Sequence, residues 1–236
     1  MWDLSLSSVL HPIVDARTGH VIGHEALLRG PRGTRWESPQ VLFDEAEHRG
    51  ARAALETRAR QLAVSRLADL APEQVLFVNI DPIVPPAQPP IPAPPDRVVL
   101  EITETRSVVD DRSLLSQISA WRSQGHRIAI DDYGAGYMGL GALLAIQPDL
   151  VKIDRSIIGG IAQDAARRAS VEAVVHVATA MGTLVVAEGV ETPEEFWTVR
   201  ACGVHYVQGY LFGKPSETPV LGPIELPEPW NSPPRG

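Results

Sequence analysis

The stretch RIAIDDYGAGYMGLGALLAIQPDLVKID, residues 127–154, contains a complete strand–helix–strand unit. A β-rich run covers residues 127–131, a short amphipathic segment covers 140–146, and a second β-rich run covers 150–154. A crossover helix between two strands places those strands side by side and parallel. Acidic residues stand at the end of both runs, so this unit predicts a parallel sheet with charged groups at its carboxyl edge.

The same alternation extends in both directions along the chain. Further β-rich runs lie at 75–80, 98–103, 184–187 and 206–208, and further amphipathic segments lie at 112–123, 165–181 and 194–201. Two helical stretches, 39–48 and 51–70, precede the first of these runs. Alternating strands and helices indicate an α/β protein with a mainly parallel sheet.

The first two apolar runs, residues 9–14 and 21–28, differ from the others. The turn-rich link between them, residues 15–20, is too short for a helix, so these two strands should pair antiparallel. With this pair the chain has eight strands. We therefore expect a modified TIM (β/α)8 barrel in which the N-terminal hairpin contributes one antiparallel strand.

Two proline-rich segments interrupt the pattern. Residues 82–90 replace the helix expected after the run at 75–80, and this connection should be extended and solvated. The end of the chain is also proline-rich. We expect one domain over residues 1–225 and a disordered tail over 226–236.

Composition limits the class of protein. A net charge of −8 over 236 residues argues against a DNA- or RNA-binding surface. The one cysteine excludes an intrachain disulfide and indicates a reducing compartment. The sequence shows neither a signal peptide nor an apolar run long enough to cross a bilayer, so we expect a cytoplasmic protein without membrane insertion by this chain.

Polar residues stand on or at the ends of seven predicted strands. They are Glu25, Asn79, Glu101, Asp131 with Asp132, Lys152 with Asp154, Glu188 and Gln208. In a barrel these ends meet at one face, where barrel enzymes have their active sites. Each carboxylate alone is more often a solvated strand end or a helix cap. Together they predict a shared site, because so many buried charges need compensating partners.

A single lysine does not neutralise five carboxylates, so the set predicts bound cations. Carboxylate and amide oxygens favour Mg²⁺ or Mn²⁺ over zinc, with Ca²⁺ as an inhibitory competitor. The expected arrangement is two ions about 4 Å apart that share one aspartate. Such a pair would suit the hydrolysis of a phosphodiester by an activated water.

The motifs along the chain resemble those of the EAL domains, which are cyclic di-GMP phosphodiesterases. They occur in the family's order between residues 6 and 215, as His11-Pro12-Ile13-Val14-Asp15, Glu25-Ala26-Leu27-Leu28-Arg29, Val78-Asn79, Leu100-Glu101-Ile102-Thr103-Glu104, Asp131 to Tyr137, Lys152 to Ser156, Ala187 to Thr192, and Gln208 to Phe212. The resemblance implies metal-dependent hydrolysis of cyclic di-GMP to linear pGpG. It also implies a homodimer and leaves room for a regulatory protein partner.

The resemblance also implies a role for each matched residue. Glu25, Lys152 and Glu188 would be catalytic, and the metal ligands would be Glu25, Asn79, Glu101, Asp131, Asp132 and Glu188. Substrate would contact Leu28, Arg29, Asp154, Glu191, Gln208 and Tyr210, and Glu104 would anchor the mobile loop that follows Asp132. Lys152 would contact the attacking water, and Arg29 would hold a phosphate.

The chain departs from the family pattern at several positions. His11 stands where glutamine is usual, Gly30 follows Arg29 where a large aromatic residue is common, and Ala135 replaces threonine. Met138 and Gly139 replace a serine pair in the loop, and residues 82–90 replace a helix. None of these changes removes a metal ligand or the lysine, so we expect them to affect substrate affinity and loop control more than catalysis.

Three alternatives remain open at this stage. A catalytically silent cyclic di-GMP receptor would signal through a partner, but it would be expected to lack some ligands. A partner-binding domain would use the proline-rich segment as its docking site. A different TIM-barrel metalloenzyme would fit the strand ends but not the ordered motifs.

Overall fold

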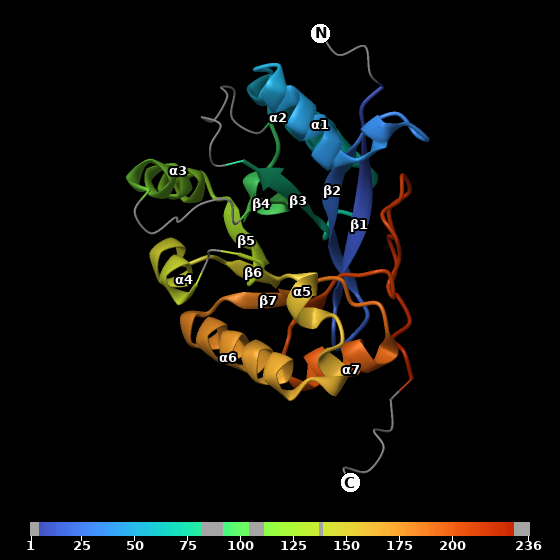
Figure 1. Ribbon diagram of the computed structural model, residues 1–236, viewed down its shortest axis with the longest axis vertical. Helices are drawn as coiled ribbons and strands as arrows, with labels where there is room; N and C mark the ends of the chain where they lie inside the picture. Colours follow the sequence, from blue (N-terminus) through green and yellow to red (C-terminus); the bar gives the residue numbers. More distant parts are fainter. Residues whose placement is uncertain (1–4, 82–91, 104–110, 137–138, 229–236) are drawn as a thin grey trace.

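A computed structural model describes residues 5–81, 92–103, 111–136 and 139–228 of the chain. Eight strands in these segments form a closed barrel in chain order (Figure 1). They are β1 (Ser7–Asp15), β2 (Val21–Arg29), β3 (Val75–Ile80), β4 (Val98–Thr103), β5 (Arg127–Tyr133), β6 (Leu150–Ile153), β7 (Leu184–Ala187) and β8 (Tyr206–Val207). The modified α/β barrel expected from the sequence is therefore confirmed.

Strand β1 gives the barrel its irregularity. It pairs antiparallel with β2 along almost its whole length and antiparallel with β8 through only two residue pairs, while every other neighbouring pair is parallel. Beyond the short contact with β8, the edge of β1 is paired at Leu10 with Ser216, which follows β8 in sequence. The C-terminal segment thus runs beside β1 and closes this seam.

Helices cover the outside of the barrel in the described segments (Figure 1). They are α1 (Pro39–His48), α2 (Arg52–Ser65), α3 (Arg112–Ser123), α4 (Leu140–Ile146), α5 (Arg155–Ile158), α6 (Ala165–Met181) and α7 (Pro193–Ala201), with short 3₁₀ turns at Arg35–Glu37, Arg66–Asp69, Pro95–Arg97 and Ile161–Gln163. Local signals begin several of them. Asp164 caps α6 through its side chain, and Thr192 with Glu195 forms a capping box at α7.

The core has two layers because alternate residues of each strand face opposite sides. Inside the barrel, a small plug of buried side chains fills the end where the strands begin: Ile13, Phe77, Val99, Ala129, Leu150 and Val186. A larger apolar layer lies between the strands and the helices. The plug leaves the carboxyl end of the barrel interior to polar residues.

The element boundaries expected from the sequence need small corrections. Strand β5 continues to Tyr133, two residues beyond the expected end, while β8 stops at Val207. The stretch 51–70 is not one helix, because α2 ends at Ser65 and a 3₁₀ turn follows. The expectations for residues 82–90 lie outside the described residues.

The C-terminal segment is described as far as residue 228. Ile224 and Leu226 pack against the apolar layer, and Trp197 Nε1 donates to the carbonyl oxygen of Glu228 at 2.7 Å. Residues 229–236 of the expected tail lie outside the described part. None of the helices in the described segments is long and apolar enough to cross a membrane.

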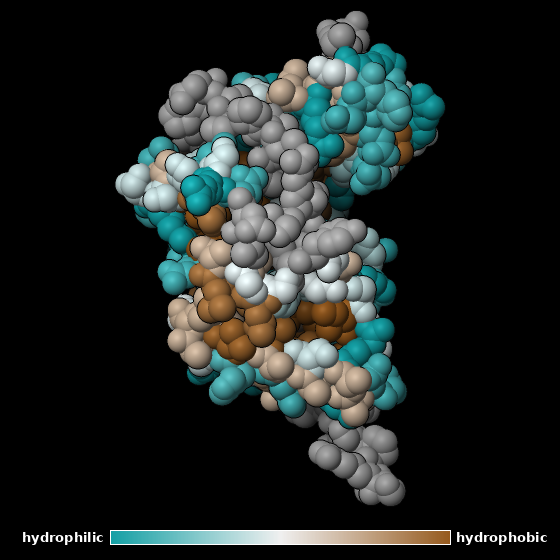
Figure 2. All heavy atoms as spheres, turned by 60° about the vertical axis from the view of Figure 1, so that its left-hand side comes forward, coloured by the Kyte–Doolittle hydropathy of each residue, from teal (hydrophilic) through white to brown (hydrophobic). Residues whose placement is uncertain are grey.

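Apolar side chains gather on the face shown in Figure 2. On α4, Leu140 and Leu144 are 52% and 64% exposed, and they lie one helical turn apart. A homodimer, which the sequence resemblance implies, stays a prediction.

Candidate active site

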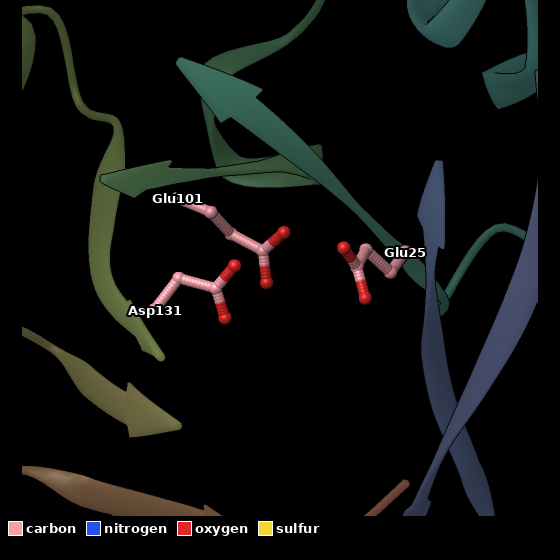
Figure 3. A group of neighbouring side chains, drawn as sticks. All are labelled: Glu25, Glu101 and Asp131. Atoms are coloured by element: carbon pink, nitrogen blue, oxygen red, sulfur yellow. The ribbon is translucent and has the colours of Figure 1, made fainter. Parts of the chain in front are cut away.

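Three carboxylates converge inside the carboxyl end of the barrel, as Figure 3 shows. Glu25 comes from β2, Glu101 from β4 and Asp131 from β5, and all three residues are buried. One oxygen from each lies within 4.8 Å of the others. Strand alternation aims these residues into the barrel, one step above the apolar plug.

A second group of carboxylates overlaps the first. Asp131, Asp132 and Glu188 also offer oxygens within 4.8 Å of one another, so Asp131 belongs to both groups. Asp132 and Glu188 are half-buried, which places the second group nearer to solvent. The arrangement offers two adjacent groups of potential ligands that share Asp131.

The backbone explains how two successive aspartates face the same site. The pairing of β5 with β6 shifts register between Ile130 and Tyr133, and Asp132 has a positive φ of 55°. In a regular strand, Asp131 and Asp132 would point to opposite faces. The irregularity breaks this alternation, and aspartate tolerates the left-handed conformation better than most residues do.

Lys152 of β6 lies in the middle of the carboxylates and is 1% exposed. Its Nζ atom is 2.6 Å from Glu188, 2.7 Å from Glu101, 2.8 Å from Asp131 and 3.4 Å from Glu25. Burial alone would lower the pKa of this ammonium, but the surrounding carboxylates raise the pKa well above its usual value. Lys152 is therefore a fixed positive charge at this site.

One lysine leaves an excess of negative charge. Burial and repulsion between neighbours raise the pKa of Glu101, Asp131 and Glu188 despite Lys152, and they raise the pKa of Asp132 to about 6. Glu25 differs from these four. Burial would raise its pKa, but Lys152 and hydrogen bonds from Asn79 and Gln208 outweigh burial and lower the pKa.

Two amides hold the Glu25 carboxylate. Asn79 Nδ2 donates to Oε1 at 2.9 Å, and Gln208 Nε2 donates to Oε2 at 2.9 Å. Gln208 lies just beyond β8 and is 2% exposed, and its own oxygen has no hydrogen bond from any described residue. Sequence-predicted residues from β2, β3 and the end of β8 are thus brought together.

The donor set fits divalent cations. Both oxygens of Glu101 and Oδ1 of Asp131 are buried. Lys152 Nζ lies 2.7 Å from Glu101 Oε1 and 2.8 Å from Asp131 Oδ1, whereas Glu101 Oε2 accepts no hydrogen bond from the described residues. Buried oxygens of this kind, in a set with excess negative charge, suit Mg²⁺ or Mn²⁺.

The residues expected to contact substrate lie at different distances from this cluster. Arg29 follows Glu25 on the same strand and donates to the Leu28 carbonyl oxygen at 2.7 Å. Tyr210 is 54% exposed, with its ring centroid 6.2 Å from that of His11. Burial lowers the pKa of the Arg29 guanidinium, and Glu25 and Tyr210 act in the opposite direction with a smaller effect, so Arg29 lies near both residues.

Two other expected substrate contacts have structural partners in the chain. Asp154 caps α5 by accepting from the Ser156 amide at 2.8 Å, and Glu191 forms an ion pair with Arg155. Asp154 still contributes to raising the pKa of Asp132. Glu104, the expected loop anchor, lies outside the described residues, as do Tyr137 and Met138 of the loop.

Sequence reasoning missed a cavity beside the cluster. It has a volume of about 250 Å³ and lies between the outward faces of β2 and β3 and the helices α1 and α2. Its apolar lining includes Leu28, Phe43, Val78 and Ile80, and its polar lining includes Arg52, Glu56, Asn79 and Asp81. Asn79 borders both this cavity and Glu25, so the two sites are adjacent.

The cavity contains a second buried pair of carboxylates. Glu56 is 6% exposed and Asp81 is 7% exposed, and Arg52 Nε donates to Asp81 Oδ2 at 2.7 Å. Burial, and then Asp81, raise the pKa of Glu56 to about 7. Glu56 lies in a helix without any strand-end pattern, so the sequence alone gave no sign of this site.

Fold and site together define a barrel with a cluster of carboxylates, able to hold divalent cations, at its carboxyl face. Comparison with family models matches residues 4–215 to the EAL domain. The chain therefore belongs to the EAL domain family, as its motifs indicated.

Curated relatives support this assignment. The chain is 30% identical over 218 residues to the probable cyclic di-GMP phosphodiesterase PdeB of Escherichia coli, covering 86% of this chain and 41% of PdeB. It is 26% identical over 217 residues to the blue light- and temperature-regulated antirepressor BluF of the same organism, covering 86% of this chain and 53% of BluF. The chain spans between 27% and 41% of the length of the first curated relatives it matches.

Solved structures show the same barrel. The Klebsiella pneumoniae BlrP1 complex with calcium and cyclic di-GMP matches with a TM-score of 0.81 and 29% identity, covering 93% of this chain and 57% of that one. A standalone EAL protein from Vibrio cholerae in its cyclic di-GMP-bound form matches with a TM-score of 0.80 and 27% identity, covering 95% and 98% of the two chains.

Proposed function

We propose that this chain hydrolyses cyclic di-GMP to linear pGpG with the help of two Mg²⁺ or Mn²⁺ ions. The observation that carries the proposal is the pair of overlapping carboxylate groups that share Asp131. Shared-ligand pairs of divalent ions are a recurrent solution for cleaving phosphodiesters. This substrate is supported by the relative PdeB, a probable cyclic di-GMP phosphodiesterase, and by the similar solved structures that contain cyclic di-GMP.

In this proposal the first ion would be held by Glu25, Asn79, Glu101 and Asp131, and the second by Asp131, Asp132 and Glu188. Ions bound there would supply Lewis acidity, which polarises the phosphoryl oxygens and lowers the pKa of an attacking water. The protein must then orient the phosphate, handle the proton and exclude bulk water.

Lys152 and Glu188 divide the proton handling. Lys152, which pairs with the surrounding carboxylates, would donate a hydrogen bond to the attacking water and place a positive charge beside it. Glu188 lies 2.6 Å from Lys152, where its carboxylate would accept the proton that the water releases. One water is consumed: its oxygen bonds to phosphorus, and the departing ribose oxygen takes up a proton.

Arg29 and the cavity would position the rest of the substrate. Arg29 lies four residues beyond Glu25 on the same face of β2, where its guanidinium would suit a phosphate. The cavity combines apolar walls with the carboxylates of Glu56 and Asp81. A guanine base offers two adjacent N–H donor groups on one edge, so this cavity would take one base of the dinucleotide.

The test is a chromatographic assay of cyclic di-GMP with purified protein, run with Mg²⁺, with Mn²⁺ and with EDTA. We expect pGpG only with the metal ions, inhibition by Ca²⁺, and no turnover by Glu25→Ala. Asp164→Asn serves as a control, because Asp164 is an exposed helix cap and asparagine caps equally well.

Two results would count against the proposal. Metal-dependent turnover by Glu25→Ala would remove the assigned centre. Tight cyclic di-GMP binding without product by the wild-type protein would instead indicate a receptor that signals through a partner. A cytoplasmic location, a homodimer and a regulatory protein partner stay predictions of the proposal.

A further inference from the structure

A chain of hydrogen bonds joins the C-terminal segment to Glu25. The carbonyl oxygen of Gly213 is 3.1 Å from Nε2 of His11, and Nδ1 of His11 is 2.9 Å from Nε2 of Gln208. The same Gln208 nitrogen is 2.9 Å from Oε2 of Glu25. His11 and Gln208 are 197 residues apart in sequence, so the barrel closure alone brings them together.

The chemistry of the two ends fixes the direction of this chain. The Gly213 carbonyl is only an acceptor, so His11 Nε2 must carry the proton. The Gln208 amide nitrogen is only a donor, so His11 Nδ1 must present its lone pair. His11 is therefore a neutral imidazole with one defined tautomer.

The opposite orientation is rejected at both ends. Rotating the Gln208 amide by half a turn would place its oxygen beside the carboxylate of Glu25, where two acceptors would face each other. Moving the His11 proton to Nδ1 would leave Nε2 facing the Gly213 oxygen in the same unfavourable way. Each bond of the chain thus requires the orientation of the next.

The outer end of the chain is anchored to the backbone. Leu10, which precedes His11, and Ser216, three residues after Gly213, exchange two backbone hydrogen bonds of 2.8 and 3.0 Å. Gly213 has a φ of +132°, which side-chain-bearing residues rarely adopt, and a Cβ there would touch Pro12 at 3.5 Å. The Gly213 carbonyl oxygen, which accepts the hydrogen bond from His11 Nε2, therefore has a fixed position beside β1.

We propose that His11 is a positioning residue for the metal-binding carboxylate Glu25, acting through the Gln208 amide. Fixing that amide with its NH₂ group toward Glu25 holds Oε2 in place, while Asn79 holds Oε1 from the other side. The inference rests on the proposed function for the identity of the metal site. It goes further because it links the packing of the C-terminal segment against β1 to the position of the metal-binding carboxylate of Glu25.

Two substitutions at His11 separate the inner bond from the outer one. His11→Asn keeps an acceptor oxygen at the position of Nδ1 and loses the bond to Gly213, whereas His11→Leu keeps a similar bulk and loses both bonds. Loss of a partner behind a metal ligand costs about 10- to 100-fold in metal affinity. We expect a loss of about tenfold or more in Mn²⁺ affinity for His11→Leu, by titration calorimetry, and a clearly smaller loss for His11→Asn.

His20→Leu is the matched control, because His20 is exposed in the turn between β1 and β2, away from Glu25. It should bind Mn²⁺ as the wild-type protein does. Unchanged affinity in His11→Leu would overturn the proposal. Equal losses in His11→Leu and His11→Asn would also overturn it, because they would assign the effect to the ring rather than to the acceptor at Nδ1.

A second measurement observes the wild-type protein and uses a variant only to assign its signals. Nitrogen NMR of ¹⁵N-histidine-labelled, metal-free protein reports which ring nitrogen carries the proton, and the His11→Asn spectrum assigns the His11 signals. We expect the proton on Nε2; a proton on Nδ1 would overturn the proposal. Both measurements are made without substrate, so failure of the positioning role is distinguishable from failure of cyclic di-GMP hydrolysis, which the product assay reports.

Discussion

Replacing Asp131 with asparagine is expected to remove both divalent-ion sites at once. Asp131 belongs to both carboxylate groups, whereas Glu101 belongs only to the first and Asp132 only to the second. In calorimetric titrations with Mn²⁺, we expect two ions per wild-type chain. Glu101→Gln and Asp132→Asn should each retain one strong site, and Asp131→Asn should retain none.

The energies involved are large enough to measure. Two unit charges 4.8 Å apart, the outer limit within each group, repel by about 3.5 kcal/mol at an effective dielectric constant of about 20. Asp131→Asn removes repulsion with several carboxylates and loses one attraction, to Lys152. The metal-free variant should therefore be at least as stable as the metal-free wild-type protein.

With added metal, the wild-type protein should be more stable than Asp131→Asn. A ligand at about 100 times its Kd stabilises a fold by about 2.7 kcal/mol per site, so two sites give about 5 kcal/mol. For a chain of this size, about 2–4 °C of melting temperature corresponds to each kcal/mol, which predicts a rise of about 10–20 °C for the wild-type protein. Asp131→Asn should show almost none of it.

The assay is thermal unfolding with EDTA and with saturating Mn²⁺, alongside the titrations. Asp164→Asn, an exposed helix cap outside the site, should shift as the wild-type protein does. Two ions bound by Asp131→Asn, or an unchanged melting shift in that variant, would refute the shared ligand. Loss of both sites in Glu101→Gln would refute the division of the carboxylates into two groups.

Three further predictions concern other parts of the site. Lys152→Met should abolish turnover. It should also lower the free energy of unfolding of the metal-free protein by about 3–5 kcal/mol in urea titrations, because it leaves buried carboxylates unpaired. Retained stability would contradict this. The pKa of Glu56 is raised from 4.5 to about 7, so the free energy of unfolding should fall as the pH rises through that range. Glu56→Gln should flatten this part of the stability–pH curve, measured in EDTA. An unaltered curve would count against the raised pKa. Gly209→Ala should destabilise by about 1–3 kcal/mol in the same denaturation assay, because a Cβ would lie 2.1 Å from the Val190 carbonyl oxygen; a neutral effect would contradict this packing.

The barrel was predictable because its signals are local. Each strand is a short apolar run flanked by turn residues, and the six-residue link between the first two runs excluded a crossover helix. The carboxylates were predictable for a related reason. Polar residues at the ends of buried parallel strands must meet at one face, whatever the details of the loops.

Other features depend on packing that no local pattern encodes. Glu56 looks like any helical glutamate until α2 packs over β2 and β3 and encloses it beside Asp81. The contact between His11 and Gln208 requires the seam between β1 and β8 to close. The sequence marked His11 as a departure from the family pattern, but only the structure gives it hydrogen-bonding partners.

The conformation at Asp132 was predictable only in part from the sequence. The sequence placed two successive aspartates at a strand end, and a regular strand would have turned the second away from the site. The register shift and positive φ that bring both inward are properties of the pairing between β5 and β6. Their cost is offset only if both carboxylates are used, which is why a shared Asp131 with Asp132 beside it favours a pair of ions over a single one.

The excess of negative charge at the site also favours bound cations. A barrel with five carboxylates around one lysine is less stable than one with an apolar interior at the same place, since the carboxylate pKa values are mostly raised by burial and repulsion. The apolar plug below the site contributes no polar group to offset this. Bound cations remove the imbalance without protonating the carboxylates, so the same residues that lower the stability of the metal-free barrel set its affinity for metal. Metal-free stability and metal binding should therefore change in opposite directions across variants of Glu101, Asp131, Asp132 and Glu188, with Asp131→Asn showing the largest difference.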